Sequence, residues 1–188
     1  PSPGYDRHFS ICEHFGIEMI TVDMKADGPD MDQVESLVAT DDSIKGIWVV
    51  PKYGNPTGTS VCDEVVDRLA SMKTAANDFR IFWDNAYAVH HLSEDVDVIK
   101  NLFTECAAVG NPDRVYVYGS TSKITFAGSG IAAIGGSKVN MDWMKKHLAI
   151  STIGPDKINQ VRHSRFFGDF AGLKSHMVKH AELIKPKF

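Results

Sequence analysis

Short apolar runs alternate with amphipathic segments along this chain, and the alternation predicts an α/β fold. Apolar runs typical of buried strands cover residues 17–22, 44–50, 81–83, 115–118 and 131–134. Helical spacing of apolar residues predicts helices that begin at Asp30, with Val34 and Leu37 facing inward, and that cover 62–75, 96–107, 140–149 and 155–162. Pro155 would occupy the first turn of the last helix. Strand–helix alternation of this kind predicts a mostly parallel, doubly wound sheet with flanking helices.

Polar residues follow three of the predicted strands at the point where each strand ends. Asn55 lies in Tyr-Gly-Asn-Pro-Thr-Gly after the strand at 44–50, and Asp84 and Tyr87 lie in Phe-Trp-Asp-Asn-Ala-Tyr. Lys123 follows the strand at 115–118 through Gly-Ser-Thr-Ser. In open α/β sheets, ligands bind at the carboxyl ends of the strands. We therefore expect these four side chains to lie along one rim of the sheet.

The chemistry of this set suits pyridoxal 5′-phosphate, a cofactor whose aldehyde is held by a lysine amine and whose ring accepts electrons. Lys123 is the candidate amine, and its place at the mouth of a sheet predicts partial desolvation. A carboxylate beside the ring nitrogen keeps that nitrogen protonated, which is a role for Asp84. Tyr87 and Asn55 can donate hydrogen bonds to the phenolic oxygen of the cofactor.

The loop around the lysine offers groups for a phosphate. Ser120 and Ser122 carry hydroxyls that can donate to phosphate oxygens, and three glycines allow the backbone to approach an anion closely: Gly119, Gly128 and Gly130. Near the start of the chain, Tyr5 is a candidate to stack on the pyridine ring.

Each of these residues also has an ordinary structural explanation. Lysines are mostly solvated, an aspartate after a strand commonly caps a turn, and Asn-Pro-Thr-Gly is usual turn chemistry. Tyr5 could equally cover the first strand as a half-buried aromatic residue. The conjunction of all the groups on successive strands favours the cofactor site.

The same residues resemble the core of the class I aminotransferases, in the aspartate aminotransferase superfamily of fold type I. The resemblance implies that Asn55 bonds the phenolic oxygen of the cofactor with help from Tyr87. It also implies that Asp84 pairs with the ring nitrogen.

Four further positions match the family pattern. The resemblance implies that Ser120 binds phosphate, that Lys123 is the Schiff-base lysine and that Tyr5 is the stacking aromatic residue. In relatives the Asn-Pro peptide is often cis, so we expect the same of Pro56.

One position departs from the family pattern. Most class I aminotransferases have a phosphate-binding arginine eight residues after the lysine, and Ile131 stands there in this sequence. The phosphate would then be met by Ser120, Ser122, Ser129, backbone amides or a group elsewhere in the protein. This loop is similar to that of a divergent subgroup of aspartate aminotransferases.

The resemblance covers nearly all 188 residues. It implies that residues 1–188 are the central part of the cofactor-binding large domain, without the N-terminal segment and C-terminal small domain of relatives. The upstream Gly-rich phosphate loop and the downstream arginine for the substrate carboxylate are not found in the sequence. We therefore expect the isolated chain to have no transaminase activity.

Composition narrows the class of protein further. Hydrophobic residues make up 43% of the chain, charged residues 23%, and the net charge of −4 gives no basic footprint for nucleic acid or for a membrane surface. No apolar run reaches transmembrane length. Cys12, Cys62 and Cys106 are scattered, which predicts a reducing, cytoplasmic setting and no metal site. The neighbouring His90 and His91 are expected to be structural.

The predicted function is an aminotransferase that moves an amino group between an amino acid, with aspartate or glutamate the first choice, and a 2-oxo acid. The resemblance implies a homodimer for the full-length protein. Three alternatives stay open: another reaction on the same scaffold, such as β-elimination; an aminotransferase-like sensing domain of a transcription regulator; and a folded fragment that cannot bind cofactor.

Overall fold

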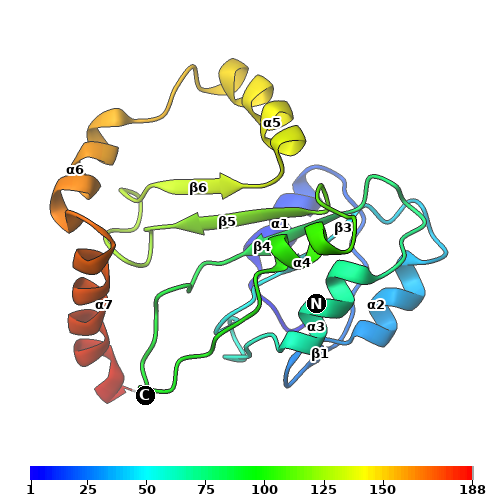
Figure 1. The fold of residues 1–188 in the computed structure, drawn as a ribbon, viewed down its shortest axis with the longest axis horizontal. Helices are drawn as coiled ribbons and strands as arrows, with labels where there is room; N and C mark the ends of the chain where they lie inside the picture. The colour runs from blue at the N-terminus through cyan, green and yellow to red at the C-terminus, as the bar shows by residue number, and fades with distance from the viewer. Residues whose placement is uncertain (188) are drawn as a thin grey trace.

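Four strands form the sheet that organises residues 1–187, the part of the chain that this computed structural model describes (Figure 1). They lie in the order β3 (Gly46–Val49), β4 (Arg80–Asp84), β5 (Val115–Ser120) and β6 (Ala132–Gly135). The first three strands are parallel, and β6 runs antiparallel to β5. The predicted α/β class, with a mostly parallel sheet and flanking helices, is confirmed.

A short antiparallel pair, β1 (Met24–Lys25) and β2 (Gly28–Pro29), precedes this sheet. The described helices are α1 (Arg7–His14), α2 (Met31–Val38), α3 (Asp63–Ser71), α4 (Leu102–Ala108), α5 (Lys138–Ser151), α6 (Lys157–Phe167), α7 (Phe170–Ile184) and the 3₁₀ helix η1 (Lys185–Lys187). Of these, α1, α7 and η1 were not expected from the sequence pattern.

The hydrophobic core lies between one face of the sheet and the helices α2, α3 and α4. Alternate residues of the strands, among them Val49, Ile81 and Val115, point to this face and are at most 1% exposed. Leu69 of α3 and Leu102 of α4 meet them from the helical layer, also at most 1% exposed. Burying a side chain of this size contributes roughly 1.5–3 kcal/mol, so this layer fixes the sheet against the two crossover helices.

The opposite face of the sheet carries a row of aromatic rings. Trp48 on β3 stacks on Phe82 of β4 at 5.5 Å between ring centroids and on Tyr118 of β5 at 5.6 Å. His8 of α1 stacks on the outer side of Trp48 at 5.2 Å, with only 6° between the ring planes. Tyr118 lies near the carboxyl end of β5, so the aromatic row reaches the point where the lysine loop begins. Burial raises the pKa of Tyr118 to about 12.

Side-chain caps decide where several helices begin. The carboxylate of Asp30 accepts from the N–H groups of Asp32 and Gln33, so α2 begins where the sequence predicted. The helix predicted for 96–107 begins later, at Leu102, because the Asn101 side chain accepts from the N–H groups of Phe103 and Thr104. Val98, which a helix over 96–107 would place on the same side as Leu102 and Cys106, is 87% exposed.

The strand predicted for residues 17–22 is wrong. This stretch belongs to no strand of the described chain; its end is held by Ser2, whose N–H donates to the Val22 carbonyl. Val22 is buried, whereas Ile17 and Ile20 are exposed. An apolar run forms a strand only where a neighbouring strand pairs with it, and apolar content alone does not supply that neighbour.

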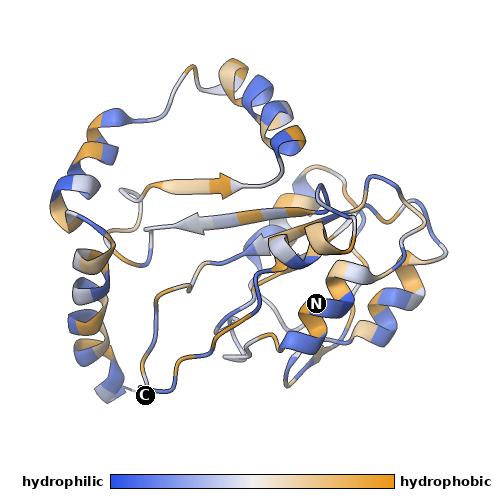
Figure 2. Ribbon diagram, in the orientation of Figure 1, coloured by the Kyte–Doolittle hydropathy of each residue, from blue (hydrophilic) through white to orange (hydrophobic). Residues whose placement is uncertain are grey.

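The last three helices follow β6; α5 lies near the end of β6, and α6 and α7 follow each other beside the opposite end of the sheet, where β5 ends (Figure 1). Pro155 precedes the N-cap residue Asp156 and is therefore outside α6, not in its first turn. Apolar and polar residues are interspersed along α5, α6 and α7 (Figure 2). Among residues 1–187, no helix combines the length and apolarity that crossing a membrane requires.

Candidate active site

Three loops at the carboxyl edge of the sheet bring the predicted site residues together. They follow β3, β4 and β5, the three parallel strands, and therefore leave the sheet at the same edge. The loops supply, in chain order, an amide, a carboxylate with a phenol, and an amine: Asn55, Asp84, Tyr87 and Lys123.

The loop after β3 presents Asn55 from a closed turn. The Gly54 N–H donates to the Thr59 carbonyl at 2.8 Å, and the Asn55–Pro56 peptide is cis, as the sequence predicted. Tyr53 has a φ of 54°, and its hydroxyl lies 2.8 Å from Nδ1 of His91. That hydrogen bond ties the Asn55 loop to the loop after β4.

Asp84 is the last residue of β4 and is partly buried. Burial raises the pKa of its carboxyl group, while a hydrogen bond from the Trp48 side chain and the positive charge of Lys123 act in the opposite direction. A carboxylate at this position can pair with a cationic ring nitrogen without leaving the rim of the sheet.

Tyr87 lies at the centre of the candidate site. Nζ of Lys123 is 4.9 Å from the centroid of its ring, within the range of a cation–π contact. Burial raises the pKa of the Tyr87 phenol, the nearby Tyr5 and Asp84 raise it further, and a hydrogen bond with the Asn55 side chain lowers it. The phenol of Tyr87 is thus within interaction range of all four of these residues.

Tyr5 belongs to the same neighbourhood. It is 43% exposed and lines a small hollow together with His8, Trp48 and Asn55. Its alternative role as a cover for a strand at 17–22 no longer applies, because that strand does not form. An exposed aromatic ring at the rim is available to stack on a planar ligand.

Lys123 lies in a tight turn directly after β5. The Thr121 carbonyl accepts from the N–H groups of both Ile124 and Thr125 at 2.9 Å, which encloses the lysine in one turn. The predicted partial desolvation is wrong for the described chain: Lys123 is exposed, because the turn projects it beyond the sheet edge.

The serines and glycines of the lysine loop are close to one another. The Ser120 hydroxyl accepts from the Ser122 N–H at 3.4 Å. A Cβ at Gly130 would lie only 2.9 Å from the Ser122 nitrogen, so this position requires glycine for the two limbs of the loop to meet. Ile131, at the position of the family's arginine, uses its backbone N–H to bond the Thr121 hydroxyl at 2.9 Å.

Sequence reasoning missed several residues around this site. Trp48 was assigned only to a strand, yet its side chain is close enough to Asp84 to lower the pKa of that carboxyl group. His90, His163 and His176 all bond the lysine loop. The adjacent His90 and His91 contact different loops, and no group of three potential metal ligands occurs within residues 1–187. No local pattern marks these histidines, because their partners lie 33 or more residues away.

The chain resembles known proteins over its whole length. The sequence profile of the family described as "Aspartate amino-transferase" matches residues 1–188. A protein from Mycolicibacterium smegmatis is 54% identical over 188 residues, which are 100% of this chain and 44% of that protein. An aspartate aminotransferase from Corynebacterium glutamicum is 51% identical, over 100% of this chain and 43% of its own length. The chain therefore spans less than half the length of these curated relatives.

Solved structures agree. The crystal structure of an aspartate transaminase from Corynebacterium glutamicum matches with a TM-score of 0.95 at 51% identity, over 100% of this chain and 44% of that one. LysN, an α-aminoadipate aminotransferase from Thermus thermophilus solved with N-(5′-phosphopyridoxyl)-L-leucine, shares the fold at 20% identity, with a TM-score of 0.81 over 98% of this chain and 46% of its own. The predicted family is confirmed: the chain belongs to the aspartate aminotransferase family.

Proposed function

We propose that the full-length protein containing this chain is an aminotransferase that uses pyridoxal 5′-phosphate. The observation that carries the proposal is the convergence, at one sheet edge, of an amide, a carboxylate, a phenol and an amine from Asn55, Asp84, Tyr87 and Lys123. The names of the relatives from Corynebacterium glutamicum support the same activity.

The donor set fits the cofactor chemically. The Asp84 carboxylate would hold the proton of the pyridine nitrogen through a charge-assisted hydrogen bond. Tyr87 and Asn55, which already interact with each other, would donate to the phenolic oxygen. Tyr5 would cover one face of the ring.

Phosphate binding is the part of the site in which this chain departs from the pattern of most class I aminotransferases. Ile131 offers no charge, so we assign the phosphate to the hydroxyls of Ser120 and Ser122 and to the backbone N–H groups of the lysine loop. The close approach of Gly130 to Ser122 keeps this loop narrow, which is typical of backbone cradles for anions.

Lys123 would bind the aldehyde of the cofactor through its amine and carry a proton to and from the substrate carbon. When bound, the cofactor supplies an electron sink for the carbanion that proton removal leaves. Nζ of Lys123 already lies beside the face of the Tyr87 ring, and the exposed turn leaves the amine accessible.

We propose an amino acid and a 2-oxo acid as the substrates, with aspartate or glutamate as the amino donor. The names of the relatives from Corynebacterium glutamicum are the support for the acidic donor. The full-length protein is proposed to act as a homodimer in the cytoplasm; the three cysteines, Cys12, Cys62 and Cys106, are free thiols, which supports a reducing setting.

Peptide mapping tests the assignment of the lysine. The full-length protein, loaded with pyridoxal 5′-phosphate and reduced with borohydride, should carry the cofactor mass on the peptide that contains Lys123. A Lys123→Ala variant should lose this label and its transaminase activity. Label on Lys52, Lys138 or another lysine would refute the assignment.

A further inference from the structure

Lys123 lies in a loop of residues 121–131 whose two ends meet at Thr121 and Ile131. The Thr121 N–H donates to the Ile131 carbonyl at 2.9 Å, and the Ile131 N–H donates to the Thr121 hydroxyl oxygen at 2.9 Å. The Thr121 carbonyl also accepts the two bonds that close the turn around Lys123. Thr121 therefore sets both the closure of the loop and the start of the lysine turn.

A histidine from a distant helix bonds this threonine. His163 of α6 is only 8% exposed, and its Nδ1 lies 2.9 Å from the Asn159 carbonyl oxygen. A carbonyl can only accept, so Nδ1 carries the hydrogen, and in the neutral ring Nε2 is left as an acceptor. Nε2 lies 3.0 Å from the hydroxyl oxygens of both Thr121 and Thr125, so it accepts from a hydroxyl of the lysine turn.

Two more histidines bond the backbone of the same turn. His90, from the loop after β4, has Nε2 3.2 Å from the Lys123 carbonyl oxygen, and His176 of α7 has Nε2 2.9 Å from the Ile124 carbonyl oxygen. Both rings must donate from Nε2, since carbonyl oxygens accept. Nδ1 of His90 is buried and has no partner in the described chain, which indicates that the bond to Lys123 fixes the orientation of this ring.

The C-terminal part of the loop, at Ser129 and Gly130, is also held by α6. The Asn159 side-chain amide donates to the Ser129 carbonyl at 2.8 Å and to the Gly130 carbonyl at 3.3 Å. Asn159 is also the residue whose carbonyl orients His163. One turn of α6 thus contacts both limbs of the loop.

We propose that His163 is a positioning residue for Lys123, and that it acts through Thr121 with His90 and His176 as supports; this proposal rests on the proposed role of Lys123. The lysine side chain itself is exposed, so packing does not hold it, and the direction of the amine follows from the backbone of its turn. Misplacement of a reacting group by about 1 Å can cost about 100-fold in rate. A turn held from three separate segments of the chain restrains Lys123 to one position.

Hydrogen exchange on the cofactor-free, full-length protein tests the contact itself. In His163→Leu, the amides of Ile124, Thr125 and Ile131 should exchange about tenfold faster, the effect of losing one hydrogen bond of average strength. His163→Gln keeps an acceptor near the Nε2 position and should retain most of the protection. His147→Leu is the control, because His147 is an exposed histidine of α5 whose ring is tilted against that of Trp143, and it makes no hydrogen bond to the loop in the described chain.

Steady-state kinetics on the cofactor-loaded protein test whether loss of the His163 contact slows the reaction at Lys123. In His163→Leu, kcat should fall about tenfold or more while KM changes little, since a displaced amine slows proton transfer without removing substrate contacts. His163→Gln should recover most of kcat. Unchanged loop protection together with unchanged kcat in His163→Leu would overturn the proposal.

A second pair of variants covers the outcome in which His163→Leu destabilises the whole protein, seen as faster exchange of the Ile81 amide in β4. Thr121→Val removes the hydroxyl that His163 bonds while keeping the shape of the side chain. Thr121→Val should therefore lower kcat, whereas Thr121→Ser, which keeps the hydroxyl, should retain most of it. Unchanged kcat in Thr121→Val would refute a path through Thr121. Borohydride labelling of the parent protein separates the two proposals: failure to label Lys123 refutes the proposed function and leaves the exchange result as a finding about the loop.

Discussion

At the scale of single residues, the fold favours the neutral form of Asp84, whereas the proposed reaction needs its charged form. Burial raises the pKa of this carboxyl group, so the charged form that the proposed reaction needs is the form that the fold disfavours. The hydrogen bond from Trp48 and the charge of Lys123 offset part of that cost. Conflicts of this kind are common at functional sites, where local stability is lost for a catalytic group.

An Asp84→Asn variant should separate the effect of Asp84 on turnover from its effect on stability. Turnover should fall by at least about tenfold, because a neutral amide cannot keep the ring nitrogen protonated and a charge-assisted bond of about 1.5–3 kcal/mol is lost. Steady-state assays with aspartate and 2-oxoglutarate measure the loss. Near-normal turnover would show that Asp84 only terminates a strand.

The same variant should be more stable than the parent at neutral pH. Since the folded pKa of Asp84 is raised, its contribution to stability is fully present below the unfolded value of about 3.9 and is lost as pH rises through the folded value. The amide of the variant does not ionise and has no such loss, so urea denaturation of the cofactor-free proteins should show a stabilised variant at pH 7 and a smaller difference near pH 4. A stability difference that grows toward acid would contradict the assigned cause.

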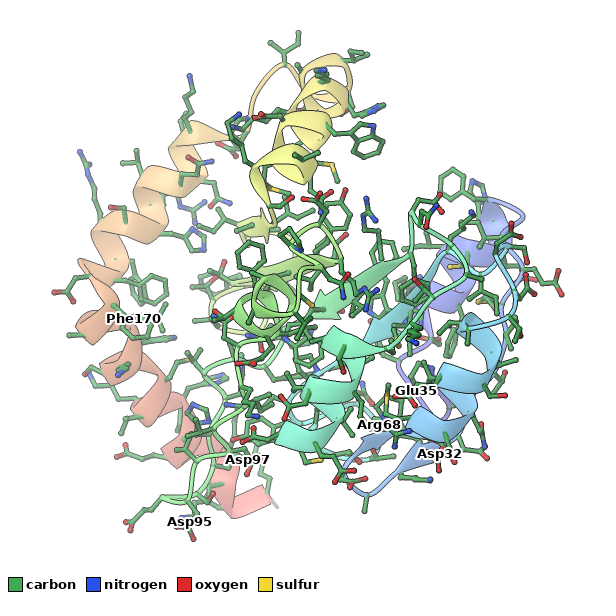
Figure 3. All side chains as sticks on the ribbon, turned by 45° about the vertical axis from the view of Figure 1, so that its right-hand side comes forward. Asp32, Glu35, Arg68, Asp95, Asp97 and Phe170 are labelled. Carbon is green, nitrogen blue, oxygen red and sulfur yellow. The ribbon has the colours of Figure 1, made fainter. Side chains whose placement is uncertain are left out.

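At the scale of elements, α2 and α3 are joined by an ion pair with defined geometry. Arg68 of α3 donates from Nε and Nη2 to the two carboxylate oxygens of Glu35 at 2.9 Å each, and Nη2 also lies 2.6 Å from Asp32 (Figure 3). Both acids raise the pKa of the guanidinium. A two-point pair restrains the angle between the helices as well as their distance.

Arg68→Met should lower the free energy of unfolding by about 0.5–1 kcal/mol, the upper range for an ion pair open to solvent. The loss measured by urea denaturation should shrink as salt is added, because salt screens the pair in the parent. Lys45→Met is the matched control: Lys45 makes one bond to Asp78, with side chains 58% and 66% exposed, and its removal should change little. Equal losses in both variants would refute the role given to the two-point geometry.

At the scale of the whole molecule, the candidate site lies where three loops meet, held by the sheet and by hydrogen bonds such as those of His91 with Tyr53 and of His90 with the Lys123 carbonyl. A ligand that bonds all three should therefore stabilise the native protein. Pyridoxal 5′-phosphate at about 100 times its dissociation constant should add about 2.7 kcal/mol to the free energy of unfolding. In Lys123→Ala the gain at the same concentration should be much smaller, and an equal gain would place the cofactor elsewhere.

Much of this architecture was predictable because its signals are local. The strands β3, β4 and β5 and the helix α3 follow from apolar periodicity, and α2 follows from its Asp30 cap. The late start of α4 was signalled by Asn101, a preferred N-cap residue that the apolar pattern outweighed in the prediction. The strand at 17–22 failed for a different reason, since strand formation depends on a neighbour that the run itself does not specify.

Local sequence was enough to specify which polar groups reach the rim of the sheet. Three successive parallel strands end at one edge, so Asn55, Asp84 and Lys123 had to emerge there once the strands were recognised. The contacts that hold the lysine turn were set by tertiary packing instead, because His163 and His176 reach it from helices 42 and 52 residues further along the chain. Hydrogen bonds across such distances depend on how the last helices pack against the loop, and no spacing within either segment encodes that contact.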